Sequence, residues 1–250
     1  MDKRKIFDTI PEKFDRWRPR YCGEAFDYII AASGLDGHKS VLEIGPGTGQ
    51  ATEPILKTGC GYLAIELGEH LAEFTRNKFG IYDNFHIVNA DFETYDFGEK
   101  RFDLVYSAAA IQWIEEKTAF SKTFRLLKNG GTLAMMFTRS DYRTPDEDLY
   151  NDIEKVYSEY FHPENPYLQK LNYKKAADYG FVDFQEKDFC CRRVFDADEY
   201  TEYIGTHSDH ISLPEPYRTK FFGGIRKAIL DHGNRLVMND TVVVYLAKKP

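Results

Sequence analysis

The chain has 250 residues, 42% of them hydrophobic and 15% aromatic, and a formal net charge of −7 at pH 7. This length and apolar content suffice for the core of one large domain. The negative charge disfavours a general nucleic-acid binder that is held by phosphate neutralisation. No apolar stretch approaches the ~20 residues that a helix needs to cross a bilayer, so no membrane span is expected.

The cysteines and the N-terminus favour a cytoplasmic location. The chain contains four cysteines, Cys22, Cys60, Cys190 and Cys191, with neither a CxxC pair nor the spacing of a disulfide framework. This usage is typical of reduced thiols and does not indicate structural zinc. Residues 1–5 lack the apolar segment of a secretory signal. Basic residues outnumber acidic ones over residues 1–20, and we interpret this stretch as a solvated face.

The first predicted elements are a helix and a strand that ends in a glycine turn. Residues 23–34 place apolar side chains at helical spacing and end at a glycine, which predicts a helix. Residues 41–44 predict a short buried strand, and glycines at 45, 47 and 49 follow it. Alternate glycines permit a sharp turn and leave room for a ligand against the backbone. A helix from about 49 to 57 is expected next, and its first N–H groups attract a carboxylate or phosphate.

Glu66 closes the next predicted strand, residues 62–66, and lies 66 − 45 = 21 residues after the first glycine of the turn. An acid at this place in a doubly wound sheet accepts hydrogen bonds from a ribose. A dinucleotide fingerprint needs a glycine at position 50, and a P-loop needs a lysine there. The chain has Gln50 followed by Ala51, which disfavours both motifs.

Helices and strands continue to alternate up to residue 138. We predict a helix at 69–79, a strand near 85–88 and a buried strand at 102–106. Phe120, Phe124 and Leu127 predict a helix face that ends with a C-cap at residues 129–131, Asn-Gly-Gly. A strand at 132–138 follows. This alternation predicts a parallel sheet with helices on both faces.

The C-terminal part is expected to add helices to the sheet. The pattern predicts a helix that starts at Pro145-Asp146 and ends before residues 163–166, with a short helix at 172–179. Further elements are a strand at 180–193, helices at 196–205 and 214–231, and a closing strand at 241–247. Helices at strand ends commonly cover a pocket. We therefore divide one domain, 1–250, into a helical cap at 1–35, a cofactor-binding core at 36–139, and inserts at 140–180 and 195–235 that form an acceptor lid.

Five segments resemble, in order, the motifs of the class I S-adenosylmethionine-dependent methyltransferases. They are residues 42–49 (Leu-Glu-Ile-Gly-Pro-Gly-Thr-Gly), 64–67, 89–92, 102–108 and 126–131. The flanking residues 14–21 and 206–214 are similar to a small-molecule branch that includes trans-aconitate-methyltransferase-like and ubiquinone-type enzymes. The resemblance implies an α/β fold with a doubly wound, mostly parallel seven-stranded sheet, Rossmann-like, whose helical inserts lie over the carboxyl ends of the strands.

This resemblance implies S-adenosyl-L-methionine as the cofactor and assigns roles to residues that match the motifs. Glu66 holds both ribose hydroxyls, because an ionised carboxylate has two accepting oxygens. The other cofactor-binding residues are Gly45, Gly47 and Gly49 as a backbone cradle, Glu43 in a network near the methionine amine, Leu67 beside Glu66, Asp91 and Phe92 at the adenine, and Ser107 and Ala108 beside the methionine portion.

The expected acceptor pocket contains Trp17, Arg18, Gln112 and Trp113, with Arg18 offering a planar fork to an anionic acceptor. The branch often carries His-Trp where this chain has Gln112-Trp113, so a histidine base is unavailable there. The candidate bases are Tyr21, His207 and His210, needed if the acceptor is a hydroxyl or an amine. The two histidines lack further ligands at metal-binding spacing, and no metal is predicted.

The resemblance favours methyl transfer to a small-molecule acceptor by in-line displacement. Two alternatives remain open at this point: a cofactor-binding regulator or scaffold without turnover, and a methyltransferase that acts on protein or nucleic acid. The net charge of −7 weighs against nucleic acid. The atom that is methylated and the oligomeric state do not follow from the sequence.

Overall fold

The computed structural model describes residues 2–141, 143, 146–163, 166 and 171–250. Its strands form one seven-stranded sheet in the order β3-β2-β1-β4-β5-β7-β6. The first five strands in this order, β3, β2, β1, β4 and β5, run parallel, whereas β7 is antiparallel to both β5 and β6. The predicted doubly wound, mostly parallel sheet is confirmed. The strands are β1 (Ser40–Ile44), β2 (Gly61–Glu66), β3 (Phe85–Asn89), β4 (Phe102–Ala108), β5 (Leu127–Asp141), β6 (Val182–Phe195) and β7 (Leu236–Lys248).

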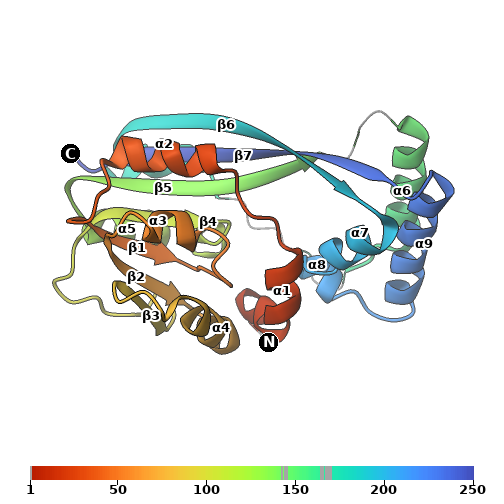
Figure 1. Cartoon of the computed structure of the whole chain (residues 1–250), viewed down its shortest axis with the longest axis horizontal. Coiled ribbons are helices and arrows are strands. Elements are labelled where there is room, and N and C mark those ends of the chain that lie inside the picture. Colours follow the sequence, from red (N-terminus) through yellow and green to blue (C-terminus); the bar gives the residue numbers. More distant parts are fainter. Residues whose placement is uncertain (1, 142, 144–145, 164–165, 167–170) are drawn as a thin grey trace.

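Helices cover both faces of the sheet (Figure 1). The first core cluster packs α2, α3 and α4 against one face, and the second packs α5 and η3 against the other. The helices of the described residues are η1 (Lys3–Thr9), α1 (Pro11–Trp17), α2 (Gly23–Ser33), α3 (Thr52–Leu56), α4 (Glu69–Phe79), η2 (Ile111–Trp113), α5 (Glu116–Leu126), α6 (Glu147–Tyr160), η3 (Tyr173–Tyr179), α7 (Ala197–Ile204), α8 (Ser208–Ile211) and α9 (Tyr217–Asp231).

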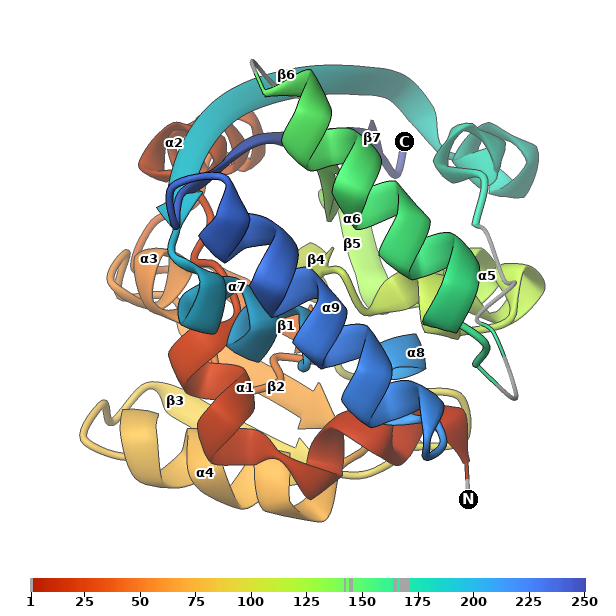
Figure 2. The same cartoon turned by 90° about the vertical axis from the view of Figure 1, so that its right-hand side faces the viewer.

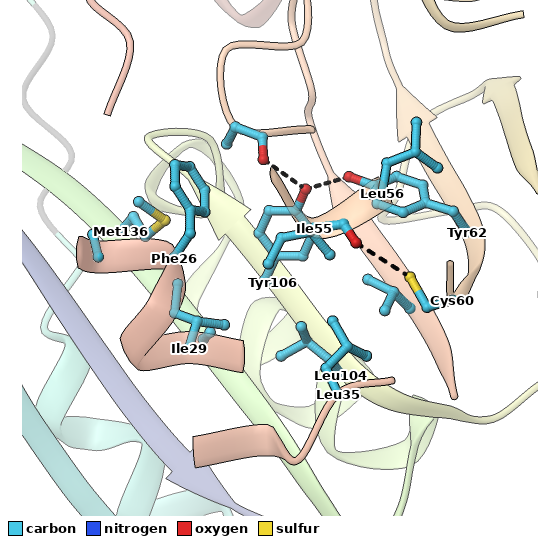
Figure 3. Close-up of a cluster of buried hydrophobic side chains, with 14 of the residues drawn as sticks. Phe26, Ile29, Leu35, Ile55, Leu56, Cys60, Tyr62, Leu104, Tyr106 and Met136 are labelled. Carbon is cyan, nitrogen blue, oxygen red and sulfur yellow. Dashed lines mark hydrogen bonds between the residues drawn. The ribbon is translucent and has the colours of Figure 1, made fainter. Parts of the chain in front are cut away.

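The first strand is buried on both faces, as expected for a central parallel strand. Val41 packs in the first core cluster, whereas Leu42 and Ile44 pack in the second, because successive side chains of a strand point to opposite faces. In the first cluster the hydroxyls of Tyr62 on β2 and Tyr106 on β4 contact each other (Figure 3). The Tyr62 hydroxyl also donates to Glu43, one residue before the end of β1.

The Asn-Gly-Gly segment at 129–131 does not cap a helix, so that prediction is wrong. Helix α5 ends at Leu126, and Leu127 already has extended backbone angles, φ −79 and ψ 143. Leu127 pairs with Phe102 of β4, which leads the chain from helix into sheet without a linker. Gly130, at φ +76, then forms an irregularity within β5 rather than a helix end.

Strands β5 and β7 extend beyond their predicted ends, whereas β6 is shifted by two residues from its predicted range of 180–193. Their pairing continues to Asp141 opposite Asn239 and to Phe195 opposite Leu236. The extension contains polar residues that only tertiary contacts satisfy: Arg193 forms an ion pair with Asp240, which also accepts from Ser140 at 2.6 Å. Figure 1 shows that this long ribbon carries α6, α7 and α9 away from the rest of the sheet.

The C-terminal helices form a separate small core. Helices α6 and α9 lie side by side (Figure 2), and α7 packs on α9. Asp146 caps α6 by accepting from the Leu149 N–H at 2.9 Å; Pro145, the other half of the predicted start, lies outside the described residues. Only η1 and α1 of the predicted cap lie over the strand ends, since α2 packs on the sheet.

Candidate functional site

A cavity of about 550 Å³ lies at the carboxyl ends of the parallel strands. The glycine turn and the ends of β2 to β5 form its floor, and residues from η1, α1, α7 and α8 cover it. Ligands gather at this edge of an open α/β sheet, and the volume is within the range for small-molecule sites. Of the described residues in the predicted lid segment 140–180, only Ser140 lines it.

Two of the three turn glycines shape the cavity. Gly45 and Gly47 have left-handed φ values of +67 and +59 and line the cavity. A β-carbon at Gly45 would lie 2.4 Å from Cβ of Ala110, so only glycine fits there. Gly49 (φ +83) instead makes room for Phe79, which a β-carbon would meet at 2.2 Å. Its left-handed backbone also delays the helix, which starts at Thr52 rather than near 49.

Glu66 lies beside the turn with both carboxylate oxygens already oriented. Oε2 accepts from the Gly47 N–H at 3.0 Å, and Oε1 accepts from the Gly68 N–H at 2.9 Å. Each oxygen keeps a second lone pair for a ligand donor. The side chain lines the cavity, although only 7% of the residue surface is exposed. This burial raises the pKa of Glu66 to about 7.

Glu43 lies beneath the turn and does not line the cavity. Its Oε2 accepts from the hydroxyls of Thr52 at 2.7 Å and Tyr62 at 2.6 Å, which ties β1 to the start of α3. Burial raises the pKa of Glu43 to about 7 despite these hydrogen bonds. The structure therefore gives it a positioning role for the turn, and its predicted link to the methionine amine stays a prediction.

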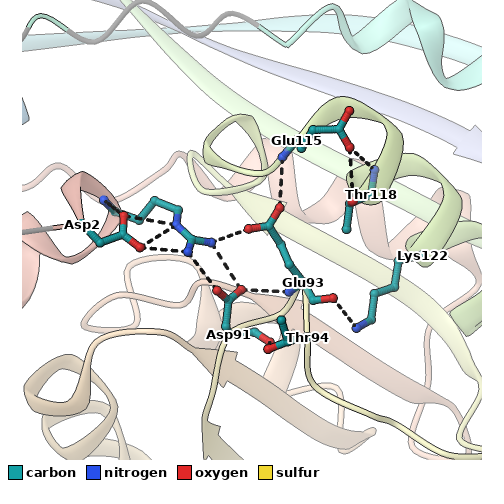
Figure 4. Close-up of polar contacts among 8 residues, drawn as sticks. Asp2, Asp91, Glu93, Thr94, Glu115, Thr118 and Lys122 are labelled. Carbon is teal, nitrogen blue, oxygen red and sulfur yellow. Dashed lines mark hydrogen bonds and ion pairs between the residues drawn. The ribbon is translucent and has the colours of Figure 1, made fainter.

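Asp91 follows β3 and lines the cavity, but its carboxylate already has a partner (Figure 4). Arg4 of η1 donates from Nη2 to Asp91 Oδ2 at 2.9 Å and from Nη1 to Glu93 Oε2 at 2.5 Å. An adenine amine would therefore share Asp91 with Arg4. Phe92 lies next to it, 5% exposed, and also lines the cavity.

Ser107 is not part of the cavity wall. Its hydroxyl donates to the Ile44 carbonyl at 2.9 Å and accepts from the Ile111 N–H at 2.9 Å, so it holds the loop after β4 against β1. The loop that it fixes supplies the wall: Ala108, Ala109 and Ala110 all line the cavity. Ser107 itself does not line the cavity, and its predicted place beside the methionine portion stays a prediction.

The predicted acceptor-pocket residues and the candidate bases separate into two groups, inside and outside the cavity lining. Gln112, Trp113, Tyr21 and His207 line the cavity with Arg18. Trp17 lies outside this lining, and the Arg16 guanidinium lies 5.0 Å from its ring centroid. His210 is also outside, because its Nε2 lies 3.0 Å from the Tyr157 hydroxyl within the C-terminal helical core.

Burial controls the protonation of the candidate bases. It raises the pKa of the Tyr21 phenol well above its ordinary value. It lowers the pKa of His210 to about 3 and that of His207 well below 6.5, and in both cases nearby Arg18 lowers the value further. Both imidazoles are consequently neutral at physiological pH.

Several lining residues were not predicted as site residues. They include Arg4, Phe7, Phe14, Tyr203 and Ser208. Phe14 belongs to the flanking segment 14–21, which was the available signal. The interpretation of the basic N-terminus as a solvated face is wrong for Arg4, which lines the cavity, whereas Arg18 lines it as expected of an acceptor-pocket residue.

Residues 42–135 match a family profile described as a methyltransferase domain. Over 169 residues the chain is 32% identical to a malonyl-[acyl-carrier protein] O-methyltransferase from Ilyobacter polytropus, covering 64% of this chain and 63% of that protein. It is 28% identical over 163 residues to the ubiquinone/menaquinone biosynthesis C-methyltransferase UbiE of Psychromonas ingrahamii, covering 62% of each. These matches identify a methyltransferase domain of the class I S-adenosylmethionine-dependent type over residues 42–135.

Solved methyltransferase structures share the fold. Phosphoethanolamine N-methyltransferase 2 of Haemonchus contortus superposes with a TM-score of 0.60 at 15% identity, over 100% of this chain and 60% of that one. A type II methyltransferase candidate from Anaeromyxobacter dehalogenans gives 0.68 at 15% identity, over 92% and 97%. The Haemonchus contortus enzyme has been solved with S-adenosylhomocysteine and with S-adenosyl-L-methionine, which together with the domain match supports S-adenosylmethionine as the cofactor. The chain spans less than two thirds of the length of the curated relatives quoted above.

The described residues contain neither a candidate membrane-spanning helix nor a cluster of potential metal ligands. No described helix is both long and apolar enough to traverse a bilayer. Within the same ranges, His, Cys, Asp and Glu side chains form no cluster of three or more that could hold a metal ion.

Proposed function

We propose that this methyltransferase binds S-adenosylmethionine in the cavity and transfers its methyl group to a small-molecule acceptor. The observation that carries the proposal is the oriented Glu66 carboxylate beside the Gly45–Gly47 turn. When bound, the cofactor supplies the reactive methyl group and its own leaving group. The protein then has to bind and align the cofactor and the acceptor and to exclude water from the cavity.

The cavity residues fit the parts of this cofactor. Each Glu66 oxygen has a lone pair for one ribose hydroxyl, and Gly45 and Gly47 leave their backbone open to a ligand because no side chain intervenes. The apolar lining residues Leu67 and Leu71 would form walls for the adenine. These residues lie at or just after the ends of β1 and β2, so the remaining lining above β4 and β5 is available to the acceptor.

The cover over the cavity would align the reactants and keep water out. Phe7 packs edge-on against Phe14 at 5.5 Å and against Trp113 at 5.7 Å between ring centroids. This aromatic cluster joins η1 and α1 to the loop after β4. Fixed alignment in a water-poor site lowers the barrier to displacement.

Tyr21 and His207 are the lining residues that could contact a hydroxyl or amine of the acceptor. The neutral imidazole of His207 can accept a hydrogen bond, but its lowered pKa makes it a weak base. We therefore assign His207 to orienting the acceptor. Because His210 lies outside the lining, we leave it out of the catalytic set.

The cavity volume of about 550 Å³ and the net charge of −7 both support a small acceptor over a nucleic acid. The names of the relatives point the same way, since they refer to malonyl-[acyl-carrier protein] and to ubiquinone or menaquinone biosynthesis. The first of these substrates is carried on a protein, so a small group presented by a carrier belongs to the same proposal.

Calorimetric titration with S-adenosylmethionine and S-adenosylhomocysteine tests the proposal. The wild type should bind both, and Glu66→Ala should weaken binding by about 100-fold, since two hydrogen bonds to a charged acceptor are lost. Glu69→Ala is the matched control, because Glu69 is exposed and does not line the cavity. No measurable binding by the wild type would refute the function.

A further inference from the structure

Arg18 lines the cavity with part of its guanidinium unsatisfied. Its Nε atom is buried and has no hydrogen-bond partner, while its Nη2 donates to the Thr206 carbonyl at 2.9 Å. Across the described ranges, no carboxylate lies within ion-pair distance of this guanidinium. A charged group out of water is unfavourable unless an opposite charge compensates it.

The neighbours of Arg18 supply no negative charge. His207 and His210 are neutral, and Arg18 itself helps to keep them so. Tyr21 stays protonated because burial raises its pKa. The acidic residues of the cavity lining are Glu66 and Asp91, which follow β2 and β3 on the far side of β1 from β4 and β5. Asp91 is also paired with Arg4.

Aromatic rings limit how a ligand can approach Arg18. The guanidinium carbon lies 5.6 Å from the ring centroid of Phe7 and 5.1 Å from that of Phe14. The rings shield the guanidinium from water on that side, and the edge that carries Nε keeps an N–H without a partner. A planar carboxylate accepts two parallel N–H bonds along such an edge, and its single charge matches the single uncompensated charge of the site.

We propose that Arg18 binds a carboxylate of the methyl acceptor, so that the substrate is a small organic acid. This inference rests on the proposed function. The carboxylate is an anchor and not the methylated group, because esterification would remove its charge and leave Arg18 uncompensated again. Another atom of the acceptor forms the bond to the methyl carbon, the carbon–sulfur bond breaks with its electron pair on sulfur, and any proton on that atom leaves to water.

The test measures binding of sodium benzoate, benzamide and sodium phosphate to protein saturated with S-adenosylhomocysteine, at constant ionic strength. Benzoate and benzamide have nearly the same shape, so their difference isolates the charge. We expect wild type to bind benzoate at least about tenfold more tightly than benzamide, since a charge-assisted bidentate contact is lost with the amide. Arg18→Met should abolish this preference, and Arg16→Met, on the exposed side of α1, should retain it.

The outcomes separate this inference from the proposed function. Equal binding of benzoate and benzamide by wild type overturns the carboxylate assignment, even if Arg18→Met does not fold. Binding of phosphate through Arg18 without benzoate overturns it too. Arg18→Lys, which keeps the charge but loses the planar fork, should show an intermediate preference. If the calorimetric titration detects no binding of S-adenosylhomocysteine but the protein alone prefers benzoate to benzamide, the proposed function is refuted and the anion site stands.

A second measurement tests the anchor. The protein is incubated with methyl-labelled S-adenosylmethionine and a mixture of small hydroxy, amino and unsaturated acids. The label should stay on the product after mild alkaline hydrolysis, because ethers, amines and carbon-bound methyl groups resist it. Release of labelled methanol would identify a methyl ester and overturn the anchor assignment.

Discussion

The guanidinium of Arg4 pairs with the carboxylate of Asp91 at 2.9 Å, although 87 positions separate the two residues in the chain. The contact joins η1 to the end of β3 and holds the N-terminal segment over this side of the cavity. The same guanidinium also forms ion pairs with Asp2 and Glu93, so Arg4 contacts three carboxylates (Figure 4).

Arg4→Met should accelerate the release of S-adenosylhomocysteine because the N-terminal segment loses its attachment. A partly exposed ion pair contributes roughly 1 kcal/mol, which corresponds to about a fivefold larger Kd. Stopped-flow displacement would measure the dissociation rate. Lys5→Met is the control, since Lys5 is exposed and outside the lining. Equal rates for wild type and Arg4→Met would show that this ion pair does not close the cavity.

Cofactor affinity should depend on pH through Glu66. Its pKa of about 7 means that the carboxyl is largely protonated below that pH, and a protonated oxygen cannot accept a ribose hydroxyl as well. The Kd for S-adenosylhomocysteine should therefore fall as pH rises, by up to about tenfold per unit below the pKa. Calorimetry between about pH 6 and 8 measures this, and Glu66→Gln should give a flatter profile. A wild-type profile as flat as that of the variant would contradict the prediction.

Glu43 should make the unliganded protein less stable as pH rises. Its folded pKa of about 7 exceeds the ordinary value of 4.5, so the native state holds a proton that the unfolded state has already lost between these values. The free energy of unfolding then falls by up to about 1.4 kcal/mol per pH unit in this window from this one group. Urea unfolding of wild type and Glu43→Gln, compared at each pH, isolates the effect. A constant difference between them would count against a raised pKa.

Gly45→Ala should destabilise the fold and abolish cofactor binding. The new β-carbon meets Ala110 at 2.4 Å and stands at a left-handed φ of +67. Gly98→Ala is a matched control, because Gly98 has φ +58 with no atom within 4 Å of its built β-carbon. The control should lose about 1–2 kcal/mol from backbone strain alone, and Gly45→Ala distinctly more. Similar losses in urea unfolding would mean that the loop yields to the extra methyl group.

Local signals in the sequence predicted most of the regular structure. The helices at 23–34 and 69–79 occur as Gly23–Ser33 and Glu69–Phe79. Their apolar spacing and the glycine after each are properties of contiguous residues. The glycine turn and the acid at the end of the second strand also lie within one short stretch, so Gly45, Gly47 and Glu66 were recognisable together.

The tertiary structure alone decided which residues meet at the cavity. In the structure the predicted site residues Gly49, Ser107, Trp17 and His210 lie outside the cavity lining, whereas Arg4, Phe7 and Tyr203, which were not predicted, are part of it. These placements depend on contacts between residues far apart in the chain, which no local pattern encodes. The burial of a charged side chain also depends on such contacts. Arg16 and Arg18 are two positions apart and have the same side chain, but Arg16 is exposed, whereas Arg18 lines the cavity and is shielded from water by aromatic rings.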